Sequence, residues 1–207
     1  MEVKKRNVKG LRAHLTLPAG KSMAHEGDFI NFYCGLGPFE CGISTKQSDF
    51  FAGGWHWFVN AAPESNEPVD MKAPVQYQDG DTIDISLMID SRDQNRIKFM
   101  VNGVIVYRSK MSYSGQKNVR LVIACAQATP ESDRPLAPWG IFHSPVVATQ
   151  MQYKNCLNIW RNVNRINSTC TNFRLPGPEL VSSKDCPQPE VYSVSPFAKN
   201  TISAWLE

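Results

Sequence analysis

The chain has 207 residues, of which 42% are apolar and 20% are charged, and its net charge is +3. These values are ordinary for a globular protein, and no apolar run is long enough to cross a bilayer, so we expect no transmembrane segment. The basic residues are scattered except at Lys4-Lys5-Arg6. A run this short is typical of a solvated terminus, so we expect no nucleic-acid partner.

The first part of the chain contains alternating and aromatic segments that predict β-strands. Residues 8–17 alternate apolar and polar side chains and end at Pro18. Residues 29–33 and 41–44 flank a glycine-rich turn, and residues 52–60 are rich in aromatic side chains. Alternation with a period of two is typical of a strand that buries one face.

Residues 77–107 predict three consecutive strands together with their turns. Apolar residues occupy every second position from Ile83 to Ile89, and the polar run 91–96 closes this strand. The next strand begins at Ile97, and Asn102-Gly103 then reverses the chain. Asn-Gly between apolar residues favours a type I′ hairpin, because both central positions need a positive φ. A meander of this kind belongs to an antiparallel sandwich.

The last strands are predicted before residue 155. Residues 119–126 are almost continuously apolar, as expected of a central strand, and residues 141–153 form the last strand. Polar loops that contain proline, at 61–74 and 129–138, separate the later strands.

The character of the sequence changes after Asn155. Residues 158–165 predict a short amphipathic helix, and residues 174–199 contain five prolines and predict an extended tail. We therefore predict an all-β, two-sheet antiparallel sandwich over residues 1–155. Residues 156–207 would add the short helix and a proline-rich, irregular tail packed on that domain.

The cysteines favour disulfides over a metal site. There are six, at Cys34, Cys41, Cys125, Cys156, Cys170 and Cys186. They include no CxxC pair and no Cys/His cluster with zinc-ligand spacing, and a domain of this size needs no metal or cofactor to complete its core, so we expect neither. The spacing suggests two local disulfides. One would join Cys34 to Cys41 across the glycine-rich turn, and the other would join Cys156 to Cys170 around an Asn-rich loop. The full connectivity stays open.

Disulfides would place the protein in an oxidising compartment. The sequon Asn167-Ser168-Thr169 supports secretion if the source is eukaryotic. The basic segment that follows Met1 leads into no apolar signal-peptide region. We expect a secreted or cell-surface protein whose leader is absent from this sequence, and a cytoplasmic protein with free thiols is the alternative.

A family resemblance covers residues 30–105. The Gly80-Asp81 strand start and the Asn102-Gly103 hairpin resemble those of concanavalin A-like jelly rolls, and also of laminin-G and SPRY domains. A longer resemblance is to the glutamic peptidases, or eqolisins, a jelly-roll family of secreted acid proteases. Their segments read approximately Trp-Val-Gly-Ile-Asp-Gly, Leu-Gln-Thr-Gly, Trp-Tyr-Glu before a Pro, and Gly-Asp before a strand. The matching segments here, in the same order, are Tyr33–Gly37, Phe39–Gly42, Trp55–Trp57 before Pro63, and Gly80-Asp81. The chain also resembles a bacillar group of uncharacterised secreted jelly-roll proteins.

The resemblance implies a jelly roll with an altered active site. In eqolisins a Glu is the base that activates water and a Gln stabilises the tetrahedral intermediate. Carried over by position, the Gln corresponds to Glu40 and the Glu to Trp57. Tryptophan accepts no proton, and a single carboxylate cannot be base and oxyanion donor at once.

We therefore predict a non-catalytic module that binds a glycan or an extended polymer in a concave groove, with a glycan or a peptide polymer as its partner. Alternation places Trp55 and Trp57 on one face of their strand, and the resemblance implies that Trp57 and Glu40 lie on the concave face. The two rings would stack on the ligand while Glu40 accepts hydrogen bonds. The alternatives are an acid hydrolase related to glutamic peptidases that uses Glu40, and a structural or interaction domain. It also stays open whether Trp55 and Trp57 line the groove or the core.

Overall fold

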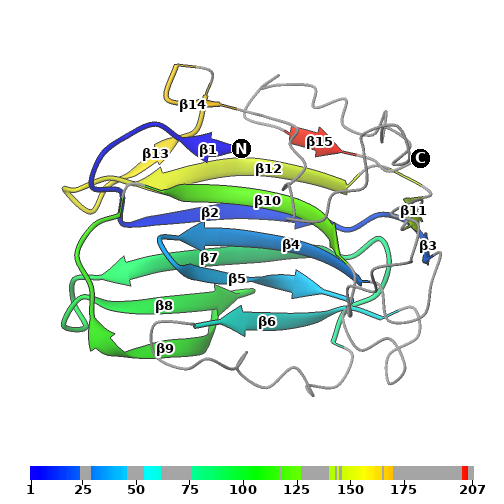
Figure 1. Ribbon diagram of the computed structural model, residues 1–207, viewed down its shortest axis with the longest axis horizontal. Helices are drawn as coiled ribbons and strands as arrows, with labels where there is room; N and C mark the ends of the chain where they lie inside the picture. The colour runs from blue at the N-terminus through cyan, green and yellow to red at the C-terminus, as the bar shows by residue number, and fades with distance from the viewer. Residues whose placement is uncertain are drawn as a thin grey trace, which may run out of the picture.

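In the computed structural model, the described part of the chain is built from β-strands (Figure 1). The described residues are 1–23, 29–45, 54–61, 76–116, 118–126, 140–142, 144, 146–164, 166–169 and 202–204. Within these ranges there is no helix that could cross a membrane. The predicted all-β, two-sheet antiparallel sandwich is confirmed.

One sheet has six strands in the order β14-β1-β10-β4-β5-β6. These strands are β1 (Glu2–Val3), β4 (Phe29–Leu36), β5 (Phe39–Ser44), β6 (His56–Asn60), β10 (Val119–Ala126) and β14 (Ser168–Thr169). As its continuous apolar run predicts, β10 is central and pairs with β1 on one side and β4 on the other.

The other sheet has seven strands. Its order is β13-β12-β2-β7-β8-β9, and β15 also pairs with β12. The strands are β2 (Gly10–Thr16), β7 (Thr82–Asp90), β8 (Arg96–Val101), β9 (Val104–Ser112), β12 (Val146–Lys154), β13 (Trp160–Asn162) and β15 (Ile202–Ala204). A separate ribbon pairs β3 (Lys21–Met23) with β11 (Gly140–Phe142). The predicted meander is β7-β8-β9, and Asn102 and Gly103 have φ of 49° and 78°, as a type I′ turn requires.

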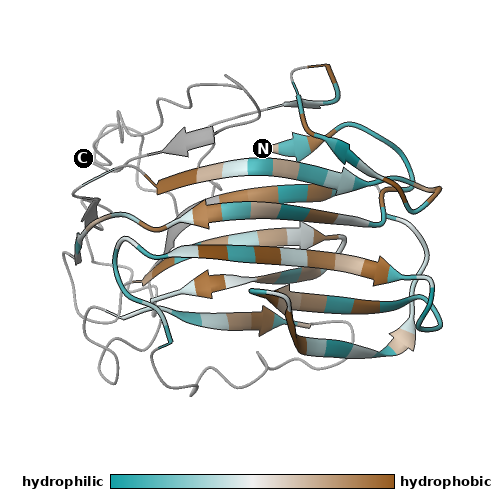
Figure 2. Ribbon diagram, turned by 180° about the vertical axis from the view of Figure 1, so that it is seen from behind, coloured by the Kyte–Doolittle hydropathy of each residue, from teal (hydrophilic) through white to brown (hydrophobic). Residues whose placement is uncertain are grey.

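The core lies between the two sheets. Along many of the strands the hydropathy alternates, which Figure 2 shows as brown and teal segments in turn. The inward side chains include Phe32, Phe39, Phe99 and Leu15, each 0% exposed. Removing side chains of this size from water stabilises the fold by about 1.5–3 kcal/mol each. The alternate side chains face outward, so a site built on the strands lies on the outer face of one sheet.

The helix predicted for residues 158–165 is wrong, because this segment forms a turn followed by β13. Asn155 Oδ1 accepts hydrogen bonds from the backbone N–H groups of Leu157 at 3.0 Å and Ile159 at 2.9 Å. Asn158 at the tip has a φ of 62°. An asparagine side chain that bonds to the nearby backbone competes with helix formation.

The described strands after residue 155 are also part of the sandwich. They join the two sheets, with β13 and β15 pairing with β12 and β14 pairing with β1. The proline-rich tail predicted for residues 174–199 lies outside the described residues.

The predicted disulfide between Cys34 and Cys41 is wrong, because both are free thiols. They lie directly opposite each other on β4 and β5, and both are 0% exposed. Burial raises the pKa of Cys34 to about 12 and that of Cys41 well above its ordinary value. Cys156 is an exposed free thiol, and Cys170 lies outside the described residues. Cys34, Cys41 and Cys156 therefore give no support to secretion.

The sequon asparagine is buried in a turn. Asn167 is 8% exposed, its Nδ2 donates to Asn162 O at 2.9 Å, and its Oδ1 accepts from Asn164 N at 2.8 Å. The amide that would carry a glycan is thus used to hold the folded turn.

We expect Cys34 and Cys41 to react with iodoacetamide only after unfolding, because a buried thiol with a raised pKa supplies little thiolate. Peptide mass mapping of unreduced native protein should find Cys156 labelled, and denaturant should add label at Cys34 and Cys41. Cys156→Ser is the control, since it should remove the label at position 156 and leave the labelling of Cys34 and Cys41 unchanged. Recovery of Cys34 and Cys41 as a linked peptide pair would contradict the free thiols.

Candidate functional site

A row of polar side chains crosses the outer face of the six-stranded sheet. Residues that pair across antiparallel strands share a face, so the pairing defines the row. Glu2 pairs with Arg120, Arg120 with Gly35, Gly35 with Glu40, and Glu40 with Asn60. The row therefore spans β1, β10, β4, β5 and β6.

Glu40 and Arg120 form an ion pair across Gly35. Arg120 Nη2 donates to Glu40 Oε1 at 2.6 Å, and the two side chains are 36% and 27% exposed. The guanidinium reaches over β4 because Gly35 has no side chain: a Cβ there would lie 2.7 Å from Arg120 Cγ and 2.9 Å from Arg120 Nε. Glycine at position 35 is thus what allows this ion pair.

The neighbouring row is Tyr33, Gly42 and Phe58. The rings of Tyr33 and Phe58 meet edge to face, with centroids 6.0 Å apart and an interplanar angle of 77°. A Cβ on Gly42 would lie 2.0 Å from Phe32 O, so only glycine fits between the rings. Burial, and secondly the charge of Glu40, raises the pKa of Tyr33 to about 12. The result is a patch that presents the partly exposed Tyr33 ring and the ion pair, while Gly35, Gly42 and Phe58 are buried.

The far end of this face carries His56. It pairs with Ser44, and both are buried, with 0% and 1% exposure. Burial lowers the pKa of His56 to about 4, so the ring is neutral at physiological pH. A neutral buried imidazole makes this face sensitive to acid.

Trp55 is a core residue and does not line a groove. Its side chain is 0% exposed and stacks on Phe32 with ring centroids 5.1 Å apart. Its Nε1 donates to Asp79 Oδ1 at 2.7 Å, and Lys21 Nζ lies 4.5 Å from the ring centroid. Lys21 also bonds to Asp79 at 2.6 Å, so these contacts hold the indole in place.

Trp57 lies on the opposite face of its strand from the ion pair. It pairs with Ile43, a core residue, and packs partly buried against the core. Glu40 instead shares its face with Asn60. The structure therefore keeps Trp57 and Glu40 apart, and the predicted platform of Trp55 and Trp57 beside Glu40 is not formed.

Sequence reasoning missed four residues of the face: Tyr33, Phe58, Asn60 and Arg120. Tyr33, Phe58 and Asn60 can be assigned to this face only when the pairing of the strands is known. One signal was present in the sequence, since Arg120 is the lone charge in the almost wholly apolar strand 119–126. A charge at such a position needs a partner, and the structure supplies Glu40.

The ion pair limits the chemistry of this face. General-base attack needs a water or substrate atom between the base and the group that stabilises the oxyanion. Glu40 Oε1 and Arg120 Nη2 touch at 2.6 Å and leave no room for either. The other carboxylate of the row, Glu2, is three strands from Glu40, or ~14 Å at the usual strand spacing. As it stands, the face is suited to hydrogen bonding and stacking.

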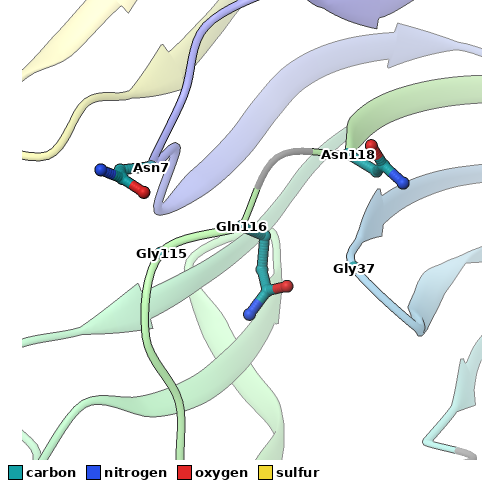
Figure 3. Close-up of a pocket in the computed structure, with 5 residues that line it drawn as sticks. All are labelled: Asn7, Gly37, Gly115, Gln116 and Asn118. Carbon is teal, nitrogen blue, oxygen red and sulfur yellow. The ribbon is translucent and has the colours of Figure 1, made fainter.

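A shallow hollow lies at the β4–β5 turn (Figure 3). It is lined by Asn7, Gly37, Gly115, Gln116 and Asn118. None of these side chains is charged, so the hollow offers neither an acid nor a base. In the part of the chain that the structure describes, no three His, Cys, Asp or Glu residues cluster in a way that could hold a metal ion.

Comparison with known proteins relates the chain to solved structures alone: no family model and no curated protein sequence matches it. The crystal structure of scytalido-glutamic peptidase with a peptide-based transition state analog matches with a TM-score of 0.63 and 13% identity, covering 100% of this chain and 96% of that chain. The structure of SCP-B, a member of the eqolisin family of peptidases, in a complex with the tripeptide Ala-Ile-His matches with a TM-score of 0.62, 13% identity and the same coverage. At this identity the similarity shows the fold. The chain has the jelly-roll fold of the glutamic peptidases, which confirms the predicted resemblance.

We expect Trp55→Ala to destabilise the protein by about 3–5 kcal/mol, because it leaves a large cavity in the core. Trp57→Ala should cost at least ~1 kcal/mol less, since Trp57 is partly exposed and its pocket can fill with water. Urea unfolding of both variants measures the difference. A larger loss for Trp57→Ala would show that the two indoles have the opposite roles.

We expect the free energy of unfolding to fall between about pH 6.5 and about pH 4 because of His56. Its pKa is lowered in the folded state, so its stabilising contribution is complete above the ordinary pKa and is lost as the pH falls through the folded value. The total is on the order of 3 kcal/mol. Urea unfolding across this range measures it. His56→Gln should flatten the dependence and Asn60→Gln should not; an unchanged slope in His56→Gln would contradict the assignment.

Proposed function

We propose that the outer face of the six-stranded sheet binds an extended polymer, with peptide as the favoured class, and does not cleave it. The observation that carries this proposal is the ion pair between Glu40 and Arg120, which lies across the backbone of Gly35. It occupies the position where the sequence resemblance places the catalytic Gln of the peptidases. The pair offers donors and acceptors to a ligand, and the contact with Arg120 engages Glu40 Oε1, so this oxygen is not free to take a proton from water.

The shape of the face suits an extended chain. Gly35 and Gly42 are buried, and because Gly35 has no side chain the Arg120 side chain can lie over β4 beside Glu40 and keep the face low. Tyr33 is partly exposed and can stack on a side chain or a sugar ring, and the buried Phe58 supports its ring through the edge-to-face contact. Arg120 and Asn60 stand on either side of Glu40 in the row and can bond to backbone carbonyl groups of a peptide.

One further observation favours a peptide over a glycan as the ligand, and another favours binding over catalysis at low pH. The solved structures of this fold hold a peptide-based transition state analog and a tripeptide, which favours a peptide over a glycan here. The buried neutral His56 on the same face makes the fold less stable in acid, which opposes an enzyme that works at low pH.

The second candidate function is a hydrolase that uses Glu40 as its base. It is favoured by the peptidases that share the fold. A substrate carbonyl would have to separate Glu40 from Arg120, which would then serve as the donor to the oxyanion. This would require the 2.6 Å contact to open on binding.

We expect saturable binding without turnover. Screening an array of unstructured peptides, and a glycan array in parallel, identifies a ligand. Fluorescence anisotropy with that ligand, labelled, then measures its affinity. Arg120→Gln should weaken binding by roughly tenfold or more, because it leaves Glu40 unpaired and removes a bidentate donor. The matched control is Arg12→Gln on the outer face of the seven-stranded sheet, where Arg12 contacts Gln152 and Trp160. It should bind like the parent protein.

Mass spectrometry of the same peptides at neutral and acidic pH tests the alternative. Cleavage by the parent protein that Glu40→Gln abolishes would establish the hydrolase and overturn the non-catalytic proposal. Binding that survives both Arg120→Gln and Glu40→Gln would place the ligand elsewhere on the molecule. Binding to glycans alone would revise the ligand class.

A further inference from the structure

Large apolar side chains are held in water on two neighbouring loops. Leu157 is 72% exposed and Ile159 is 43% exposed on the β12–β13 loop, and Ile166 is 88% exposed on the β13–β14 loop. Figure 2 shows hydrophobic colour at the tips of both loops. Single exposed apolar residues are common, but three on two loops joined by one short strand form a distinct feature.

Both loops are held by hydrogen bonds from asparagine side chains. Asn155 Oδ1 accepts from the backbone of Leu157 and Ile159, as described above. Asn164 Oδ1 accepts from Ile166 N at 3.0 Å and from Asn167 N at 3.1 Å. The apolar tips therefore stand on ordered turns, and little conformational entropy would be lost when they bind a partner.

A basic segment lies beside these loops. Lys4, Lys5 and Arg6 are exposed, and their segment is tied to both loops: Lys4 N donates to Asn167 O, and Lys9 N donates to Lys154 O, each at 2.8 Å. In Figure 1 the segment between β1 and β2 runs toward the β12–β13 loop. Residues 4–9 and 155–167 together contain six Lys or Arg and no Asp or Glu. We name the exposed members of this surface, Lys4–Arg6, Leu157, Ile159, Arg161 and Ile166, the basic–apolar corner.

We propose that the basic–apolar corner docks onto the surface of an anionic phospholipid bilayer. Aliphatic tips enter the boundary between headgroups and acyl chains, while nearby lysines and arginines contact the negative headgroups, and the two contributions together give stable but reversible attachment. The charge of the corner is complementary to such a surface. Nucleic acid would use the basic residues but would leave Leu157 and Ile166 in water, so the bilayer accounts for more of the corner. This surface is separate from the proposed polymer-binding face.

Co-sedimentation of the full chain with vesicles tests the proposal. Vesicles of phosphatidylcholine with phosphatidylglycerol should pellet the protein, and vesicles of phosphatidylcholine alone should pellet much less. The double variant Leu157→Ser, Ile166→Ser and the triple variant Lys4→Gln, Lys5→Gln, Arg6→Gln should each lower the partition coefficient by roughly tenfold or more. Added salt should weaken binding of the parent protein and have little effect on the triple variant. Unchanged urea unfolding curves would show that the variants are folded.

Two control variants test whether the loss of vesicle binding is specific to the basic–apolar corner. Ile105→Ser changes another exposed isoleucine, 41% exposed on β9, and should bind vesicles like the parent. Arg120→Gln should also bind vesicles like the parent, so failure of the polymer-binding proposal leaves this one standing. Failure of the parent to bind anionic vesicles, or equal loss in Ile105→Ser, would overturn the proposal. Binding to duplex DNA that is lost in the triple variant and kept in the double variant would replace the bilayer by nucleic acid.

Discussion

The register of the β4–β5 hairpin is the constraint on which the candidate site depends. Leu36 pairs with Phe39, so the turn between the strands consists of Gly37 and Pro38 alone. Gly37 has a φ of 58°, and the proline ring fixes the following φ at about −65°, a combination that suits the twist of a two-residue hairpin. A slip of one residue would bury Glu40 in the core and turn Cys41 to solvent. The short turn prevents this slip, and every contact of the site follows from the pairing.

Much of the fold was predictable because the alternation of apolar and polar residues is typical of β-strands and because turn residues such as Asn-Gly show where strands end. β7, β8, β9 and the Asn102-Gly103 turn were predicted from the sequence and are present. The cysteines show where this reasoning ends: the glycine-rich turn predicted that Cys34 and Cys41 are neighbours, which they are, but spacing contains no information on whether two neighbouring thiols are oxidised. The helix predicted for residues 158–165 failed for a different reason, because apolar spacing does not show that Asn155 bonds to the backbone in place of a helical turn.

The site was less predictable than the fold, because alternation says which residues share a face and not which face is buried. It correctly placed Trp55 and Trp57 on one face of their strand. The sequence resemblance then implied that Trp57 faces the groove, but its partner Ile43 places it on the core side. Arg120 could be recognised as an unusual charge within its strand, yet its link to Glu40 appears only when the pairing of β10 with β4 and of β4 with β5 is known.

The two proposed surfaces are joined by β1, which suggests how they would act together. Glu2 on β1 begins the polar row that contains Arg120 and Glu40, and the chain continues from β1 directly into the basic segment of the corner. At the usual spacing between strands, Arg120 lies ~5 Å from β1 and Glu40 ~14 Å from it. If both proposals hold, a bilayer bound at the basic–apolar corner would lie only a few strand spacings from the polymer bound on the six-stranded sheet. The protein would then hold its ligand at the membrane surface, where a polymer that is itself attached to that surface is most concentrated.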